Sequence, residues 1–144
     1  MESNIDVVRT FYDALSNGDM GSLFCRFAPQ IDWREADGIP YADRNPYRTP
    51  QDVATGVLAR IGADWDGFMV VPESFASEGG LVVMLGRYKG TNRTTGKPLD
   101  VPVAHAWTVK EGAIRAFRQY VDTVLVRRAM QGPAATFSLP AYTF

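Results

Sequence analysis

Hydrophobic residues recur at helical spacing in the first third of the chain and at alternate positions in much of the rest. A first helix is predicted after an N-cap at Ser3 or Asn4, and it ends at Gly18. A second, shorter helix is expected to begin at Asp19, and a third at Thr49. The apolar stripes that these helices would bury are Val7, Val8, Phe11, Tyr12 and Leu15, then Leu23, Phe24 and Phe27, then Val53, Val57, Leu58 and Ile61.

Alternating positions predict strands, one early and four late. Residues 31–35 indicate a short strand between the second and third helices. The later strands are expected at residues 68–78, 81–90, 99–109 and 113–124. Gly79-Gly80 and Lys110-Glu111-Gly112 are typical of hairpin turns. Because helices and strands are segregated, the pattern predicts an α+β fold in which three N-terminal helices cover a curved, mostly antiparallel sheet.

The chain of 144 residues is long enough for one domain, which we expect to span residues 1–130. Residues 131–144 have no periodicity but carry Phe137, Leu139, Tyr142 and Phe144. This tail is expected to pack on the body of the domain or on a partner subunit.

Charge and composition exclude several classes of function. A formal net charge of -1 gives no reason to expect binding to nucleic acid or to an anionic membrane. With Cys25 and His105 as the single cysteine and histidine, neither a disulfide framework nor a structural metal site is expected. We expect no cofactor. The absence of a long apolar run or a leader pattern favours the cytoplasm.

The hairpin over residues 105–122 carries the candidate chemistry. Strict alternation would place the following residues on one face: His105, Trp107, Val109, Ile114, Arg118, Tyr120 and Asp122. Apolar groups lie at the turn end of that face and titratable groups at its open end, as in the lining of a closed pocket. Phe117 and Val121 would lie on the outer face, which suggests a homodimer through the sheets.

The predicted pocket is suited to a small apolar ligand, polycyclic compounds included. Its substrate-binding residues are expected to be Trp33, Tyr41, Trp107, Arg118 and Tyr12. Burial would raise the pKa of Asp122 and make it a base near neutral pH. His105 would position or relay a proton, Tyr120 would stabilise an oxyanion, and Glu35 would return the proton.

Several local motifs together are similar to the SnoaL-like polyketide cyclase and ketosteroid isomerase-related families of the NTF2-like superfamily. Phe11-Tyr12-Asp13-Ala14-Leu15 resembles the opening helix, residues 110–114 the hairpin turn, and residues 118–122 the closing strand. The resemblance covers about residues 5 to 125. It implies a cone-shaped, cystatin-like α+β fold with a pocket in the cone.

The resemblance also suggests roles. Asp122 matches the general base of the cyclases and epoxide hydrolases, and His105 resembles the pocket histidine of the cyclases. Glu35 falls at the position of the base in the steroid isomerases, but Phe11 and Ala104 stand where their oxyanion hole would be. Arg87 fits the epoxide hydrolases, whereas Lys89 replaces their second acid.

These features predict a cofactor-independent enzyme that uses general acid/base catalysis on a hydrophobic carbonyl or hydroxyl compound. Isomerisation, cyclisation and elimination would all use the same residues. One alternative is a non-catalytic small-molecule binding or carrier protein, and another is an interaction domain. Epoxide hydrolysis is a further, less supported alternative.

Overall fold

Most helical segments precede the four long strands in the structure, a computed structural model that describes residues 2–132. The helical segments before the last strands are α1 (Asn4–Ser16), η1 (Pro40–Arg44), α2 (Pro50–Val53), η2 (Ala54–Leu58) and α3 (Ala59–Asp64). The strands are β1 (Phe27–Arg34), β2 (Trp65–Glu78), β3 (Leu81–Asn92), β4 (Pro98–Lys110) and β5 (Ala113–Val121), and α4 (Thr123–Met130) follows them. The α+β class predicted from the sequence is confirmed.

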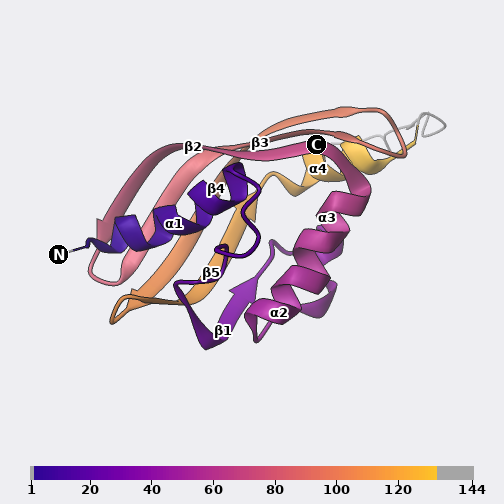
Figure 1. The fold of residues 1–144 in the computed structure, drawn as a ribbon. Helices are drawn as coiled ribbons and strands as arrows, with labels where there is room; N and C mark the ends of the chain where they lie inside the picture. Colours follow the sequence, from indigo (N-terminus) through magenta and orange to yellow (C-terminus); the bar gives the residue numbers. More distant parts are fainter. Residues whose placement is uncertain (1, 133–144) are drawn as a thin grey trace, which may run out of the picture.

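The strands form one curved sheet in the order β1-β5-β4-β3-β2 (Figure 1). Strands β2 to β5 pair antiparallel with their neighbours along the chain, whereas β1 pairs with β5 in parallel. The sheet is therefore mostly antiparallel, as expected. The parallel pair brings the ends of β1 and β5 to the same edge of the sheet.

Helix α1 lies along one face of the sheet and contacts β2, β3, β4 and β5 (Figure 1). Ser3 caps it through the backbone N–H of Asp6, while the Asp6 carboxylate accepts from the Ser3 backbone. Its buried stripe includes Phe11 and Tyr12. The predicted first helix is confirmed. It could be predicted because its cap and its period are both local properties of the sequence.

The third predicted helix is also confirmed, as the continuous stretch α2, η2 and α3. Thr49 caps it through the backbone N–H of Asp52, and Pro50 occupies the first turn. The middle segment η2 is a π-helical turn. This stretch packs against β1 at one end and β2 at the other.

Aromatic rings fill the space between α1 and the sheet. The Trp33 and Phe117 rings stack with centroids 3.8 Å apart, and Trp107 lies 4.7 Å from Phe117 and 5.1 Å from Phe11. Trp107 has no exposed surface. Large rings at this density replace open space with contacts, so the described part of the cone has a solid aromatic centre.

The second predicted helix is wrong. Residues 20–26 form hydrogen-bonded turns, with bonds such as Leu23 N–H to the Met20 carbonyl at 3.4 Å. Gly18 and Gly21 lower helix propensity in a segment too short to compensate. Phe27, expected on that helix, begins β1 and pairs with Ile114.

The hairpin turn at residues 110–112 is confirmed, but the face of β5 beyond it is not the expected one. Val109 pairs with Ile114 and Thr108 with Ala116, so Arg115 is an extra residue that forms a β-bulge. A single extra residue exchanges the two faces of every later position. The buried residues of β5 are therefore Ile114, Phe117 and Gln119.

The last strand is also shorter than predicted, because residues 123–130 form helix α4. Asp122 is its N-cap. Within residues 2–132 no helix has the length and hydrophobicity that crossing a bilayer requires. The prediction of a packed tail at 131–144 falls almost wholly outside the described residues, and the proposed boundary at residue 130 stays a prediction.

Candidate functional site

His105 lies inward on β4, between the sheet and α1, with 3% of its surface exposed. Both ring nitrogens are engaged by tyrosine hydroxyls. Nδ1 lies 2.6 Å from the Tyr12 hydroxyl, and Nε2 lies 2.5 Å from the Tyr88 hydroxyl. Two elements far apart in sequence, α1 and β3, thus hold one imidazole in place.

The two tyrosines have further partners. Trp107 Nε1–H donates to the Tyr12 hydroxyl at 2.8 Å, and Gln119 Nε2–H donates to the Tyr88 hydroxyl at 2.7 Å. A neutral imidazole has one N–H and one lone pair, so one tyrosine donates to His105 and the other accepts from it. His105 is satisfied as a neutral ring.

Burial lowers the pKa of His105 to about 3. Burial also raises the pKa of Tyr12 and of Tyr88 well above that of a free tyrosine, and for Tyr88 the nearby charge of Glu35 acts in the same direction. At neutral pH this cluster therefore carries no charge. It is suited to fixing geometry rather than to accepting a proton.

Glu35 directly follows β1 and has 3% of its surface exposed. Trp33 Nε1–H donates to its Oε2 at 2.9 Å. Its backbone is fixed by Asn45, which accepts from the Glu35 N–H at 2.9 Å and donates to its carbonyl at 2.8 Å. The other carboxylate oxygen, Oε1, is buried and has no hydrogen-bond partner.

This environment changes the acidity of Glu35. Burial raises its pKa from 4.5 to about 7, against the opposing effect of the hydrogen bond from Trp33 and of the nearby Gln119 amide. An unpartnered buried carboxylate oxygen is costly, and such groups concentrate at functional sites. Glu35 is therefore poised to gain or lose a proton near neutral pH.

Gln119 connects the two halves of the site. Its Nε2–H donates to Tyr88, and its Oε1 accepts from the backbone N–H of Ala36 at 3.0 Å. A chain of polar groups thus runs from Trp107 through Tyr12, His105 and Tyr88 to Gln119, beside Glu35. We call these groups the buried polar chain.

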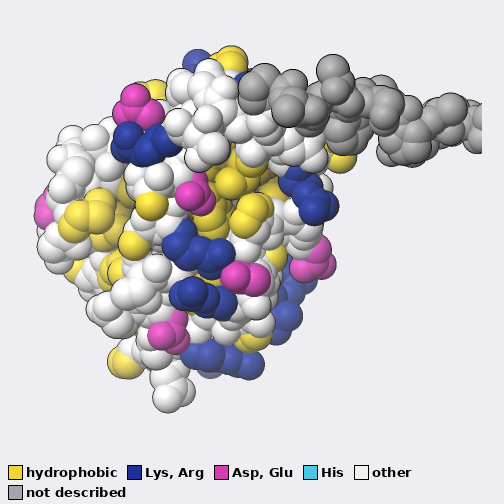
Figure 2. Space-filling view, turned by 90° about the vertical axis from the view of Figure 1, so that its right-hand side faces the viewer, with side chains coloured by type: hydrophobic (Ala, Val, Ile, Leu, Met, Phe, Trp, Pro, Cys, Tyr) yellow, Lys and Arg dark blue, Asp and Glu magenta, His cyan; other side chains and the backbone are white. Residues whose placement is uncertain are grey.

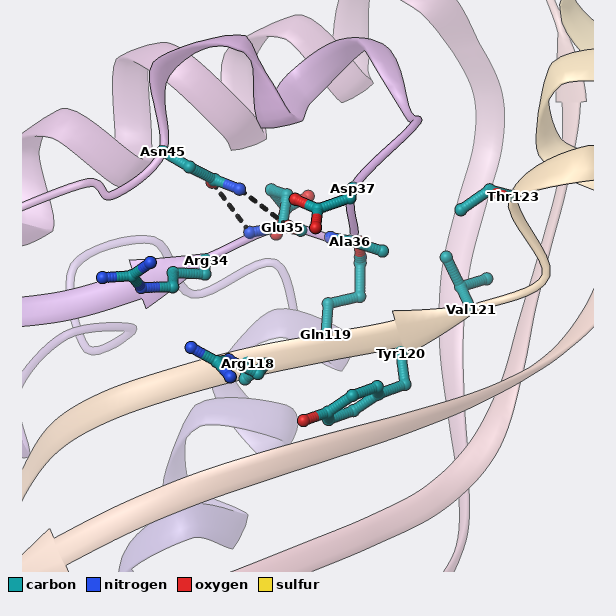
Figure 3. A pocket seen from close by; sticks show the side chains of 10 residues that line it. All are labelled: Arg34, Glu35, Ala36, Asp37, Asn45, Arg118, Gln119, Tyr120, Val121 and Thr123. Atoms are coloured by element: carbon teal, nitrogen blue, oxygen red, sulfur yellow. Dashed lines mark hydrogen bonds between the residues drawn. The ribbon is translucent and has the colours of Figure 1, made fainter.

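A groove of about 430 Å³ opens where β1 ends beside β5. Figure 3 shows Gln119 directed toward the Glu35–Asp37 segment, while the side chains of Arg34 and Arg118 extend toward one end. We call it the β1–β5 groove, and its lining residues are Arg34, Glu35, Ala36, Asp37, Asn45, Arg118, Gln119, Tyr120, Val121 and Thr123. Glu35 and Gln119, both buried, are therefore the interior residues that reach this groove.

The structure places three predicted site residues away from the interior. Tyr120 is 54% exposed, and Arg118 is also exposed. Asp122 is exposed and accepts from the Leu125 backbone N–H at 3.1 Å as the cap of α4. The inward orientation predicted for these residues is wrong, because the bulge at Arg115 exchanges the two faces of β5.

The predicted aromatic ligand wall lies in the core instead. Trp33, Trp107 and Tyr41 are buried, and none of them lines the β1–β5 groove. Tyr41 donates to Asp64 at 2.7 Å, in the layer between η1 and α3. Tyr12 is buried too, in contact with His105 rather than with the groove. The groove is lined by charged and amide groups more than by aromatic rings.

The alternation pattern alone identifies Glu35 and His105 but misses Tyr88, Gln119 and Asn45. Tyr88 follows Val82, Met84 and Gly86 on the inward positions of β3, so its orientation could have been found from the sequence. Gln119 is hidden by the bulge.

Ala104 and Arg87, the positions compared with the isomerases and the hydrolases, both face away from the interior. Ala104 faces outward, so the inward positions of β4 near it carry Val103 and His105. Arg87 binds Asp100 at 2.7 Å on the outer face of the sheet. No group of three His, Cys, Asp or Glu side chains within the described residues is arranged to hold a metal ion.

The family model of the SnoaL-like domain matches residues 8–117. The chain belongs to the SnoaL-like family. A comparison with curated proteins finds no match. An NTF2-like protein from Burkholderia thailandensis is 37% identical, with a TM-score of 0.86 over 91% of this chain and 99% of that one.

More distant solved structures have the same fold as this SnoaL-like chain. TerC, co-crystallized with polyporic acid, is 19% identical with a TM-score of 0.77, covering 88% of this chain and 97% of that one. A ketosteroid isomerase-like protein from Catenulispora acidiphila, in complex with trimethylamine, is 19% identical with a TM-score of 0.71, covering 90% and 95%. The NTF2-like, cystatin-like cone predicted from the sequence is confirmed.

Proposed function

We propose that this SnoaL-like chain is a cofactor-independent enzyme in which Glu35 is the general base. Its substrate is a carbonyl or hydroxyl compound that enters the β1–β5 groove. The observation that carries the proposal is the buried, unpartnered Oε1 of Glu35, a residue that lines that groove and whose pKa is raised to about 7. A base of that pKa is matched to proton transfer at neutral pH.

In the proposed reaction, Oε1 removes a proton from the carbon next to a carbonyl, and the electron pair of the C–H bond moves to the carbonyl oxygen. Asn45 and Gln119 line the same groove. Asn45 uses one amide hydrogen in its bond to the Glu35 carbonyl, and Gln119 uses one in its bond to the Tyr88 hydroxyl. The second amide hydrogen of Asn45 is a donor for the developing oxyanion, whereas that of Gln119 faces the Glu35 carboxylate. The buried polar chain keeps Gln119 in place.

Three outcomes start from that enolate. Return of the proton to another carbon gives isomerisation, attack on a second carbonyl gives cyclisation, and departure of a β-hydroxyl, protonated by Glu35, gives elimination. The SnoaL-like family supports isomerase or cyclase chemistry of this kind. The substrate determines which of the three occurs.

Exchange of the α hydrogens of 2-tetralone in D₂O, followed by ¹H NMR, tests the base directly. We expect the protein to accelerate this exchange, and Glu35→Gln to lower the acceleration by ~10²-fold or more. Glu35→Asp should retain part of it. Asp13→Asn, which removes an exposed acid on α1, serves as a matched control and should leave the rate unchanged.

Equal exchange rates for the native protein and Glu35→Gln, with both folded by circular dichroism, would exclude Glu35 as the base. The rate should also rise with pH through about 7, because only the ionised carboxylate accepts a proton. A rate that is flat from pH 5 to 9 contradicts the proposal.

A binding protein without turnover is the second candidate. It is favoured by the similarity to TerC, which was co-crystallized with polyporic acid. In that case native mass spectrometry would find a retained small molecule, and Glu35→Gln would leave its retention unchanged while no tetralone exchange is detected.

We also propose that a second copy of the chain covers the outer face of the sheet. Leu81, Leu85 and Tyr120 are large, exposed side chains on that face. Leu85, Ala104 and Tyr120 are register partners across β3, β4 and β5, so they form one continuous row. Exposed apolar rows of this kind favour association.

A further inference from the structure

The charged residues of the β1–β5 groove are unevenly arranged. Arg34 on β1 and Arg118 on β5 are register partners in the parallel pair, and both line the groove. Figure 3 shows their guanidinium groups extending toward the same end of it, whereas Asp37 lies with Ala36 and Glu35. Like charges on neighbouring strands repel each other unless something balances them.

Neighbouring carboxylates neutralise the positive charge of these arginines only in part. Asp32 accepts from Arg34 Nε at 2.9 Å and lies 4.0 Å from Arg48. The Arg34 hydrogen bond is the main cause that holds the pKa of Asp32 below its usual range, and the positive charges of Arg34, Arg48 and Arg118 add to it. Asp37 also acts on Arg34 through its charge, so three guanidinium groups lie near two carboxylates.

Across the rest of the visible surface the signs are mixed. On the face toward α3 and α4, Lys or Arg and Asp or Glu side chains alternate around hydrophobic ones (Figure 2). Arg60, for example, binds Asp43 at 2.8 Å. Arg118, by contrast, lines the β1–β5 groove among several arginines near Asp32.

We propose that Arg34 and Arg118 form an anion subsite that binds a carboxylate of the substrate. The substrate would then be a carbonyl compound that also carries a carboxylate group, with its acidic carbon toward Glu35. Successive side chains of a strand point to opposite faces, so the link between the base and the subsite is the groove that Arg34, Arg118 and Glu35 all line, not their adjacency in sequence. A planar guanidinium binds a carboxylate through two parallel hydrogen bonds.

This inference rests on the proposed function in naming the substrate, but its test measures binding alone. 2-Naphthoate and 2-naphthamide have the same shape and differ in charge. We expect NMR titration at low salt to give about fivefold or tighter binding of naphthoate. The preference should shrink as sodium chloride is added, because salt screens exposed charges.

Substitutions of the two arginines test whether they cause the preference for 2-naphthoate over 2-naphthamide. Arg118→Gln should reduce it to less than twofold, and Arg34→Gln should weaken it. Arg118→Lys should keep part of it, because one positive charge remains. Arg115→Gln is the matched control, since Arg115 is exposed on the same strand but does not line the groove.

The outcomes separate the subsite from the base. Three results would each overturn the subsite: the two probes bind equally, neither probe binds, or the preference survives in Arg118→Gln. Glu35→Gln should abolish tetralone exchange while leaving the naphthoate preference intact. Loss of exchange with equal probe binding would leave the base in place and remove only the subsite.

Discussion

At the scale of single residues, environment rather than residue type decides the chemistry of this site. Glu35 and His105 are equally buried, and burial moves their pKa values in opposite directions because it disfavours the charged form of each. His105 has a hydrogen-bond partner for each ring nitrogen, whereas Glu35 has one free oxygen. The sequence could identify both residues but not this difference.

Glu35 makes the stability of the fold depend on pH. Its pKa is raised in the folded state, so the native protein binds this proton more tightly than the unfolded chain does. The free energy of unfolding should fall as pH rises from 4.5 to about 7, by about 3 kcal/mol from this group. Urea unfolding of Glu35→Gln should lack this decline.

His105 has the opposite effect, because its pKa is lowered by burial. Its contribution to stability is lost as pH falls from 6.5 toward 3. Between about pH 4.5 and 6.5 the two effects oppose each other, so the contribution of Glu35 is read as the difference between the native protein and Glu35→Gln. If Glu35→Gln and the native protein lose stability equally above pH 5, the carboxyl is not buried as described.

Tyr12→Phe tests the buried polar chain. The substitution removes the acceptor of Trp107 Nε1–H and one partner of His105, so it should lower the free energy of unfolding by ~1–3 kcal/mol. Tyr120→Phe removes a hydroxyl from an exposed ring and should stay within ~0.5 kcal/mol of the native protein. Similar losses for both variants in thermal unfolding would contradict this assignment.

At the scale of elements, local signals were predictable and the face of one strand was not. The cap of α1 and the turn at Glu111-Gly112, where both φ angles are positive, depend on residues close in sequence. The facing of β5 depends on Arg115, the extra residue of a bulge that alternation does not reveal. That one residue moves Gln119 to the buried face of β5 and Tyr120 to its exposed face.

The role of Asp122 as a base stays a prediction, and its place as the N-cap of α4 makes it testable. Asp122→Ala should lower the free energy of unfolding by ~1 kcal/mol, whereas Asp122→Asn, which also caps helices, should cost less. Both variants should keep tetralone exchange. A ~10²-fold loss of exchange in Asp122→Asn would assign the base to Asp122 instead of Glu35.

At the scale of the whole molecule, the sheet has a face covered by α1 and an outer face that carries exposed apolar side chains. The covered face holds the aromatic core and the buried polar chain. The groove lies at the edge between the faces, where β1 ends beside β5. Sequence patterns predicted the layers of this fold, but a groove at a strand end depends on tertiary pairing.

The outer row at Leu85 and Tyr120 bears on the assembly. If two copies meet there, Leu85→Lys should shift the mass measured by light scattering from dimer to monomer. Met20→Lys changes an equally exposed apolar residue outside the sheet and should leave the mass unchanged. A native protein that is monomeric at 100 μM would exclude the proposed dimer.

The hydrogen bond from Trp33 to Glu35 gives the protein a built-in optical indicator. Trp33 is buried, and its indole N–H lies 2.9 Å from the carboxylate that titrates near pH 7. Ionisation places a full negative charge beside the chromophore, so the emission wavelength and intensity of Trp33 depend on the protonation state of Glu35. The state of this carboxyl can therefore be read in the intact protein by fluorescence, before any substrate is known.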